Sequence, residues 1–241
     1  MLVGSLGQVS TVNHSGGTIL THANITYHHL SVGNTQSLNG DLDQTDVLGD
    51  LIIQGGAVLN TNGNNITIGG NLQNSGQLNS VSGSGDIVTF AGAGAQAMSG
   101  TNNLDILVIN NSNGVAHSGT TEIYSGLEIA DGSFTNSGSL TLVSTGTRTA
   151  NLLEMGAGAS CGSITANRYI PSTTALGWRH FTSPIQGSTL QDFQDGGGSS
   201  PNGIFTYGYT GSNQPSAGGQ YSTYTYDGAN VPNGGNFDLG W

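Results

Sequence analysis

Short apolar runs separated by glycine- or asparagine-containing turns recur along the first two thirds of this chain, and this repetition limits the folds open to it. Glycine supplies 41 of the 241 residues. It stands between apolar runs in Gly55-Gly56, Asn62-Gly63, Gly69-Gly70, Ser75-Gly76, Asp131-Gly132 and Ser137-Gly138. Because Gly and Asn adopt positive φ at little cost, these dipeptides predict tight corners. No window has apolar residues at helical spacing, so we expect an all-β chain with almost no helix.

The spacing of the runs predicts the architecture. Five runs align on their first residues, which are Leu51, Leu72, Ile87, Leu104 and Leu127. Their mean spacing of about 19 residues suits one coil of a β-solenoid, in which each turn adds a rung of short strands to a continuous core. Alternation within a run places Ile66 and Ile68 on one face and Thr67 on the other. We therefore expect a parallel β-solenoid (β-helix) with repeats of about 20 residues over residues 1–165.

Aromatic residues mark a second unit. Of the 16 aromatic residues, 12 lie from residue 166 onward. Alternating Tyr207 and Tyr209, followed by alternating Tyr224 and Tyr226, fit strands of an antiparallel sheet. We expect residues 166–241 to form a small antiparallel β-sandwich that is truncated at its end.

Charge excludes several classes of partner. The chain has no Lys and three Arg against 14 acidic residues, for a formal net charge of −11. Nucleic acids and anionic membranes need clustered cations, so neither is an expected partner. No apolar stretch approaches the ~18 residues of a membrane span, and the single cysteine, Cys161, excludes an intramolecular disulfide. Since the chain starts within the repeat pattern, we expect the remainder of a parent chain at both ends.

Two groups of acidic residues suggest sites. Asp41, Asp43, Asp46 and Asp50 lie within ten residues, and calcium favours clustered oxygen ligands. Their spacing matches neither the EF-hand loop nor the nonapeptide of calcium-bound β-rolls, and alternating Asp residues on a strand can simply face solvent. The favoured interpretation is that no cofactor is bound, with calcium at these four residues as the alternative.

The second acidic group could carry catalysis. Asp86, Asp105 and Glu128 each come early in an apolar run and could stack in successive rungs, where paired carboxylates do acid–base work in polysaccharide lyases and hydrolases. Acidic residues at such places are more often solvated corner residues. We therefore expect no enzyme, and keep a carbohydrate-active β-helix enzyme as the alternative function.

The aromatic third of the chain offers a further site. Sugars stack on aromatic faces, so a glycan platform could be built from Trp178, Tyr207, Tyr209, Tyr224 and Tyr226. The competing interpretation is that these rings form the core of a small sandwich, which has few other large apolar residues. A non-catalytic glycan-binding module is thus a second alternative function.

Several segments resemble a known group of proteins. They read FAGAGAQ at 90–96, LDILVINN at 104–111, RYIP at 168–171, GWRHFTSPI at 177–185 and TLQDF at 189–193. In their order, and in following Gly/Asn-rich β stretches, the segments are similar to repeat-rich secreted surface proteins of Bacteroidetes that are exported by type IX secretion. The resemblance covers most of residues 49–193. It implies an extracellular or cell-surface, adhesin-like β protein, and it supplies no catalytic residues.

Together these observations predict a structural or adhesive segment of a larger secreted bacterial protein. Its expected partners are glycans or other surface proteins, and its expected location is extracellular or at the cell surface.

Overall fold

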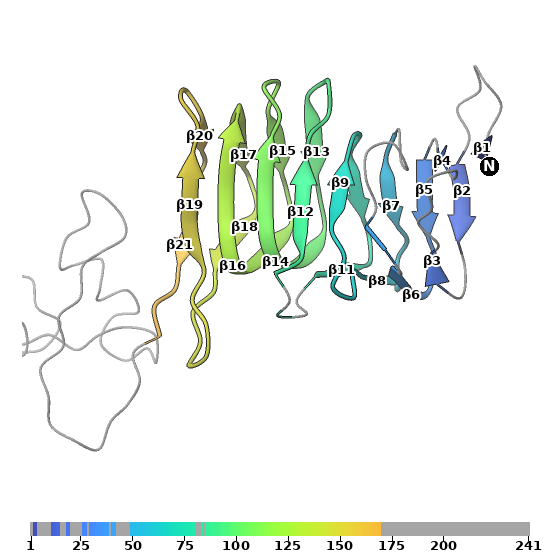
Figure 1. Ribbon diagram of the computed structural model, residues 1–241, viewed down its shortest axis with the longest axis horizontal. Coiled ribbons are helices and arrows are strands. Elements are labelled where there is room, and N and C mark those ends of the chain that lie inside the picture. The colour runs from blue at the N-terminus through green and yellow to red at the C-terminus, as the bar shows by residue number, and fades with distance from the viewer. Residues whose placement is uncertain are drawn as a thin grey trace, which may run out of the picture. The chain divides into compact units, whose positions relative to one another are not determined.

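The computed structural model describes residues 29–38, 40–41, 49–80, 83 and 85–169. It also describes the backbone of four short strands nearer the N-terminus, β1 (Leu2–Val3), β2 (Thr11–His14), β3 (Thr18–Ile19) and β4 (Thr26–Tyr27). These parts of the chain contain strands and turns but no helix, as the sequence predicts. The strands form a parallel β-solenoid of about six turns (Figure 1).

Apart from β1 and β4, the described strands lie on three sides of the solenoid. The first side stacks β2, β5 (His29–Val32), β7 (Leu51–Ile53), β10 (Leu72–Asn74), β13 (Gln96–Met98), β15 (Val115–His117), β17 (Ser133–Asn136) and β20 (Ser160–Cys161). The second side stacks β3, β6 (Thr35–Leu38), β8 (Val58–Asn60), β11 (Gln77–Ser80), the first halves of β14 (Thr101–Asn110) and β16 (Thr120–Asp131), β18 (Ser139–Leu142) and β21 (Thr165–Ala166).

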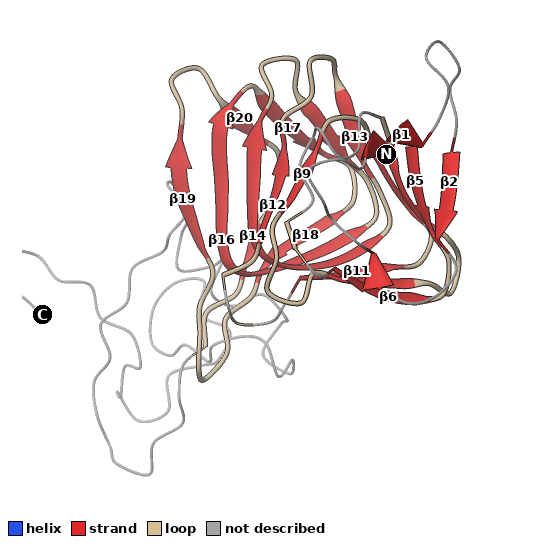
Figure 2. Ribbon diagram, turned by 45° about the vertical axis from the view of Figure 1, so that its right-hand side comes forward, coloured by secondary structure: helices blue, strands red, loops and turns tan. Residues whose placement is uncertain are grey.

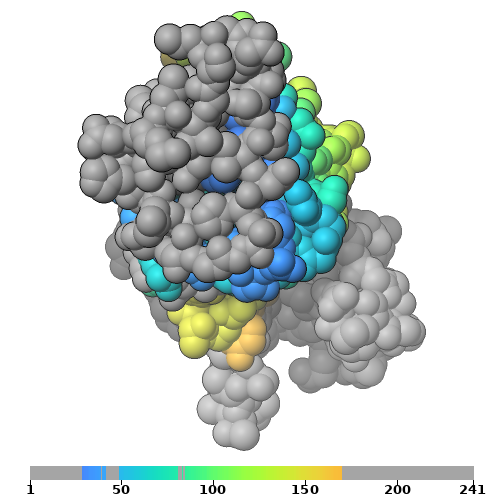
Figure 3. Space-filling view, turned by 90° about the vertical axis from the view of Figure 1, so that its right-hand side faces the viewer, coloured from blue at the N-terminus to red at the C-terminus, as the bar shows by residue number. Residues whose placement is uncertain are grey.

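The third side stacks β9 (Ile66–Ile68), β12 (Ile87–Phe90), the second halves of β14 and β16, and β19 (Asn151–Met155). Every pairing between these strands is parallel, and Figure 2 shows strands of successive coils lying side by side. β14 and β16 continue from the second side to the third, with a register shift after Leu104. Figure 3 looks along the stack, with the early blue coils in front of the green and yellow ones.

The register corrects the repeat alignment made from the sequence. Leu51 and Leu72 are true partners on the first side. Ile87 and Leu127, however, lie on the third side and Leu104 on the second. Partners in successive coils are 21 residues apart at Leu51 and Leu72 but 26 apart at Leu72 and Met98. The predicted period of about 20 residues matches the shorter coils, since Val115 and Phe134 are 19 residues apart, although the alignment mixed strands from different sides.

The predicted corners are confirmed. Each of the six dipeptides lies in a turn or bend, or at a strand end, where the chain passes from one side to the next. Gly119 shows why the residue type matters, because its φ is +103° and a Cβ on it would overlap the carbonyl oxygen of Gly100 in the neighbouring coil. Close stacking at this corner therefore requires glycine.

Alternation along the strands builds the core. Ile66 and Ile68 are buried while Thr67 between them is partly exposed, as predicted. Leu30, Leu51, Leu72 and Met98 form one continuous inward column on the first side, and each is at most 1% exposed. Burying one such side chain contributes about 1.5–3 kcal/mol, so the column is a major source of stability.

Parallel pairing continues to Ala166, where β21 joins β18. From residue 170 onward, the sandwich expected over 166–241 lies outside the described residues. Within the described residues there is no helix with the length and hydropathy needed to span a membrane.

Candidate functional site

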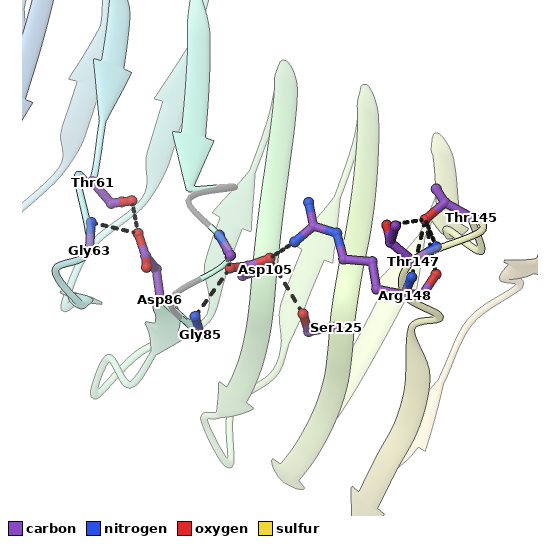
Figure 4. A network of polar contacts seen from close by, with 10 residues as sticks. Thr61, Gly63, Gly85, Asp86, Asp105, Ser125, Thr145, Thr147 and Arg148 are labelled. Atoms are coloured by element: carbon purple, nitrogen blue, oxygen red, sulfur yellow. Dashed lines mark hydrogen bonds and ion pairs between the residues drawn. The ribbon is translucent and has the colours of Figure 1, made fainter.

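Two of the acidic residues singled out in the sequence lie at the corner between the second and third sides. Asp86 directly precedes β12, and Asp105 lies at the register shift of β14. Because Ile87 pairs with Ile106, the two aspartates occupy equivalent places in successive coils. Both are buried, with 2% of Asp86 and none of Asp105 exposed. We call these residues and the polar groups that bind them the acidic corner (Figure 4).

Asp86 holds the turn of the preceding coil. Its Oδ2 accepts hydrogen bonds from the Thr61 hydroxyl and from the Gly63 backbone N–H, the latter at 3.0 Å. Asn62 and Gly63 have φ values of 55° and 86°, so this turn leaves backbone donors outside any strand pairing. A carboxylate is a strong acceptor for such donors, which explains an aspartate at this buried place.

Asp105 repeats the arrangement one coil further along. Its Oδ2 accepts the backbone N–H groups of Gly83, at 3.0 Å, and Gly85, at 3.2 Å. Its Oδ1 accepts the Ser125 hydroxyl at 3.4 Å and forms an ion pair of 2.8 Å with Nη1 of Arg148. Both oxygens of this fully buried carboxylate are therefore bound within the protein.

Arg148 comes from an insertion between β18 and β19. Ser144 and Thr149 form an isolated antiparallel bridge at its base. The Thr145 backbone N–H donates to the Arg148 carbonyl at 2.8 Å, and the Thr145 hydroxyl accepts the Arg148 N–H at 3.2 Å. These bonds fix the backbone of Arg148, so its side chain is aimed back over the coil that holds Ser125 (Figure 4).

Tyr124 and Glu122 form the outer part of the corner. The Arg148 guanidinium lies 4.8 Å from the centroid of the Tyr124 ring, within the range of a cation–π contact. The Tyr124 hydroxyl donates to Glu122 Oε2 at 2.6 Å. This hydrogen bond, together with burial of the phenol, raises the pKa of Tyr124 to about 12. The phenol therefore stays protonated at neutral pH and serves as a hydrogen-bond donor.

Glu128, the third carboxylate of the predicted stack, is not in the corner. It lies opposite Val108 on the third side, and Ser125 takes the place that follows Asp105. The structure thus brings Asp86 and Asp105 together and leaves Glu128 apart. The cause is the alignment of runs from different sides: Asp105 follows Leu104 on the second side, whereas Glu128 follows Leu127, which pairs with Leu107 on the third side.

The arrangement missed by sequence reasoning is the group of Glu122, Tyr124 and Arg148. Arg148 lies 43 residues from Asp105 in the chain, so no local pattern joins them. A usable signal was the scarcity of cations, because a buried aspartate in a chain with three arginines has few possible partners.

A second buried network lies at the corner between the first and second sides. His117 Nδ1 is 2.7 Å from Asn136 Oδ1, and its Nε2 is 2.9 Å from the Thr121 hydroxyl. Asn102 Nδ2 donates to Thr121 at 3.2 Å, and Asn74 Nδ2 donates to Asn102 Oδ1 at 2.9 Å. Asn136 donates through Nδ2 to the Ser163 carbonyl, and its Oδ1 can only accept, so the His117 Nδ1–H donates to it. This ladder links four successive coils.

The calcium alternative is only partly covered by the structure. Asp43 and Asp46 lie outside the described residues. Asp41 Oδ1 accepts the Asn65 N–H at 2.7 Å. Asp50 accepts the Asn71 N–H at 2.8 Å and the Gln73 side-chain amide at 2.6 Å. No group of three or more His, Cys, Asp or Glu placed to hold a metal occurs in the described part of the chain.

The five residues of the predicted glycan platform lie outside the described residues; they are Trp178, Tyr207, Tyr209, Tyr224 and Tyr226. Comparison of the chain with protein-family models, with curated proteins and with solved structures gives no match.

Proposed function

We propose that this chain is a structural or adhesive segment of a larger secreted bacterial surface protein. The observation that supports the proposal best is that the Asp105 carboxylate is fully bound within the protein. A general acid or base has to present an oxygen to its substrate, but both oxygens of Asp105 accept hydrogen bonds from neighbouring coils or from Arg148. Asp105 therefore joins neighbouring coils of the solenoid.

The solenoid supplies the mechanical part of this function. Successive coils pair with one another through parallel strands, on two sides from β2 and on three sides from β9, so the length of the unit grows by ~4.8 Å for every coil added. Polar ladders at two corners add contacts between coils. A stack of this kind suits a spacer that holds other parts of a protein at a distance from a surface.

Location at the cell surface rests on the resemblance of residues 49–193 to repeat-rich proteins exported by type IX secretion. A lysine-free chain with a net charge of −11 is compatible with that setting, since its partners there need not be nucleic acids or anionic lipids.

The test is to incubate the purified chain with soluble and insoluble polysaccharides, with and without calcium. Retention and the release of new reducing or unsaturated ends are scored together. Retention without release supports an adhesive role. If the chain is not retained and releases no product, a purely structural role is supported. Release of products that Asp105→Asn abolishes, while Glu128→Gln retains it, would contradict the proposal and favour a polysaccharide lyase or hydrolase.

A further inference from the structure

The outward positions of the second side form two polar columns. Strand register places one residue from each coil in the first column, which contains Thr35, Val58, Gln77, Thr101, Thr120 and Ser139. The second column, two residues further along each strand, contains Asn60, Asn79, Asn103, Glu122, Thr141 and Thr165. We call the two columns together the polar face.

The polar face is a regular array. Neighbouring strands are ~4.8 Å apart, and residues two apart on a strand are ~6.6 Å apart. Thr101, Thr120 and Ser139 are exposed, whereas Asn79 and Asn103 are partly buried. Asn79 Nδ2 donates to Asn60 Oδ1 at 3.0 Å, which fixes the amide orientation in two successive coils. These two amide groups are thus held in place before any ligand arrives, which lowers the entropy cost of binding.

The other two sides offer no comparable array among the described residues. On the first side, the column that starts with His29 and Asp50 continues to Ala97 and Ala116, which have no polar side-chain atoms. On the third side, the outward positions include Ile87 and Ile106, and Leu153 is 50% exposed. Among the described residues, the hydrogen-bonding surface is thus most continuous on the second side, where Val58 is the one apolar position of the two columns.

Charge and composition narrow the class of partner. The polar face carries one ionisable group, Glu122, and its carboxylate already accepts the Tyr124 hydroxyl. A face without cations on a chain of net charge −11 repels anionic polymers such as nucleic acids and polyuronates. The centre of a protein–protein interface is typically rich in aromatic residues, Met and Arg, none of which occurs in the two columns. A neutral polymer rich in hydroxyl groups matches the donors and acceptors that remain.

We propose that the polar face binds neutral polysaccharide chains through repeated hydrogen bonds, an inference that rests on the adhesive form of the proposed function. Each contact is weak by itself, and the number of coils supplies the affinity, because contacts made by one rigid surface on one polymer act together.

The test compares two variants that make the same chemical change on different sides. Thr101→Val combined with Thr120→Val removes two hydroxyls from the polar face, and Thr135→Val removes an exposed hydroxyl from the first side. Valine keeps the shape and the strand preference of threonine, and unchanged unfolding curves confirm that each variant is folded. Depletion from solution is measured with insoluble cellulose, chitin and a neutral β-1,3-glucan, and with polygalacturonate as the acidic counterpart.

We expect the wild-type chain and Thr135→Val to bind at least one neutral polymer equally well, and the double variant to bind about fivefold or more weakly. Equal binding by all three proteins would overturn the assignment to the polar face while leaving an adhesive function intact. Binding to polygalacturonate alone would overturn the charge argument. If the wild type binds no polymer but inhibits ice recrystallisation, and the double variant does not, the ligand of the polar face is an ice surface and the polysaccharide proposal is wrong. Product release would instead contradict the proposed function itself.

Discussion

Arg148 reaches past one whole coil of the solenoid to pair with Asp105, with 2.8 Å between Nη1 and Oδ1. The aspartate is fully buried, whereas 31% of the arginine side chain is exposed. Three coils are therefore joined by a single ion pair, to which the Ser125 hydroxyl contributes from the coil between.

Loss of Arg148 is expected to destabilise the solenoid. Arg148→Gln leaves the buried Asp105 carboxylate without its cation, and we expect a loss of about 2–3 kcal/mol, since water reaches the exposed part of the arginine site. Denaturant unfolding measures the change. Arg168→Gln, at an exposed position, is the control and should change stability by less than about 0.5 kcal/mol. If Asp105→Asn does not recover part of the loss in the double variant, the ion pair is not the cause.

The same substitution at two neighbouring asparagines is expected to destabilise the protein at one position and to have little effect at the other. Asn102 is buried in the ladder of hydrogen bonds that contains His117, at the corner between the first and second sides. Asn103 lies on the outer face of the second side. Asn102→Leu removes the bonds to Asn74 and Thr121 and should cost about 1–3 kcal/mol although leucine is apolar. Asn103→Leu should change the free energy of unfolding by no more than about 0.5 kcal/mol. Similar costs at both positions would contradict the role given to the ladder.

Glycine is required at Gly119 but not at Gly94. In Gly119→Ala the new Cβ meets the Gly100 carbonyl at a φ of +103°, so we expect a loss of at least about 2 kcal/mol. A Cβ at Gly94 has nothing within 4 Å. Gly94→Ala should therefore be neutral or stabilise by up to about 1 kcal/mol. Thermal unfolding of the two variants measures both changes in stability. If Gly119→Ala is as stable as the wild type, the corner can open and glycine is not required there.

Tyr124 should ionise at a higher pH than an ordinary tyrosine. The difference in phenolate absorbance between the wild type and Tyr124→Phe is expected to have a midpoint near pH 12. Glu122→Gln should lower that pKa toward 10, and Arg148→Gln should raise it, because the guanidinium favours the phenolate.

The same shift has a consequence for stability. A pKa that is raised on folding means that the folded state holds the proton more tightly than the unfolded chain. The stabilising contribution is thus complete below pH 10 and is lost as the pH rises through about 12. Tyr124→Phe should lack this loss in unfolding measurements across that range. A difference titration with its midpoint near pH 10 would refute the hydrogen bond to Glu122.

Much of the fold could be read from local sequence. Gly-Gly, Asn-Gly and Ser-Gly pairs mark corners because positive φ and close backbone contact depend on the residue at that position. Alternation at Ile66, Thr67 and Ile68 identifies the inward face for the same local reason. The aspartates at the starts of runs also pointed to a real cluster, since Asp86 and Asp105 do stack.

The tertiary structure decided which strands share a side and which polar groups meet. Coil length varies because loops and the insertion that carries Arg148 differ in length, so Leu72 pairs with Met98 rather than with a residue 21 positions further along. Glu128 falls outside the acidic corner because Leu127 lies on the third side and Leu104 on the second. Arg148 falls within it because its insertion lies close enough in space to reach Asp105. By itself the sequence determined an all-β repeat with glycine corners, because turn conformation and alternation are local properties. Register and the pairing of distant charges came only from the stacking of coils, because hydrogen bonds between strands join residues that no local pattern relates.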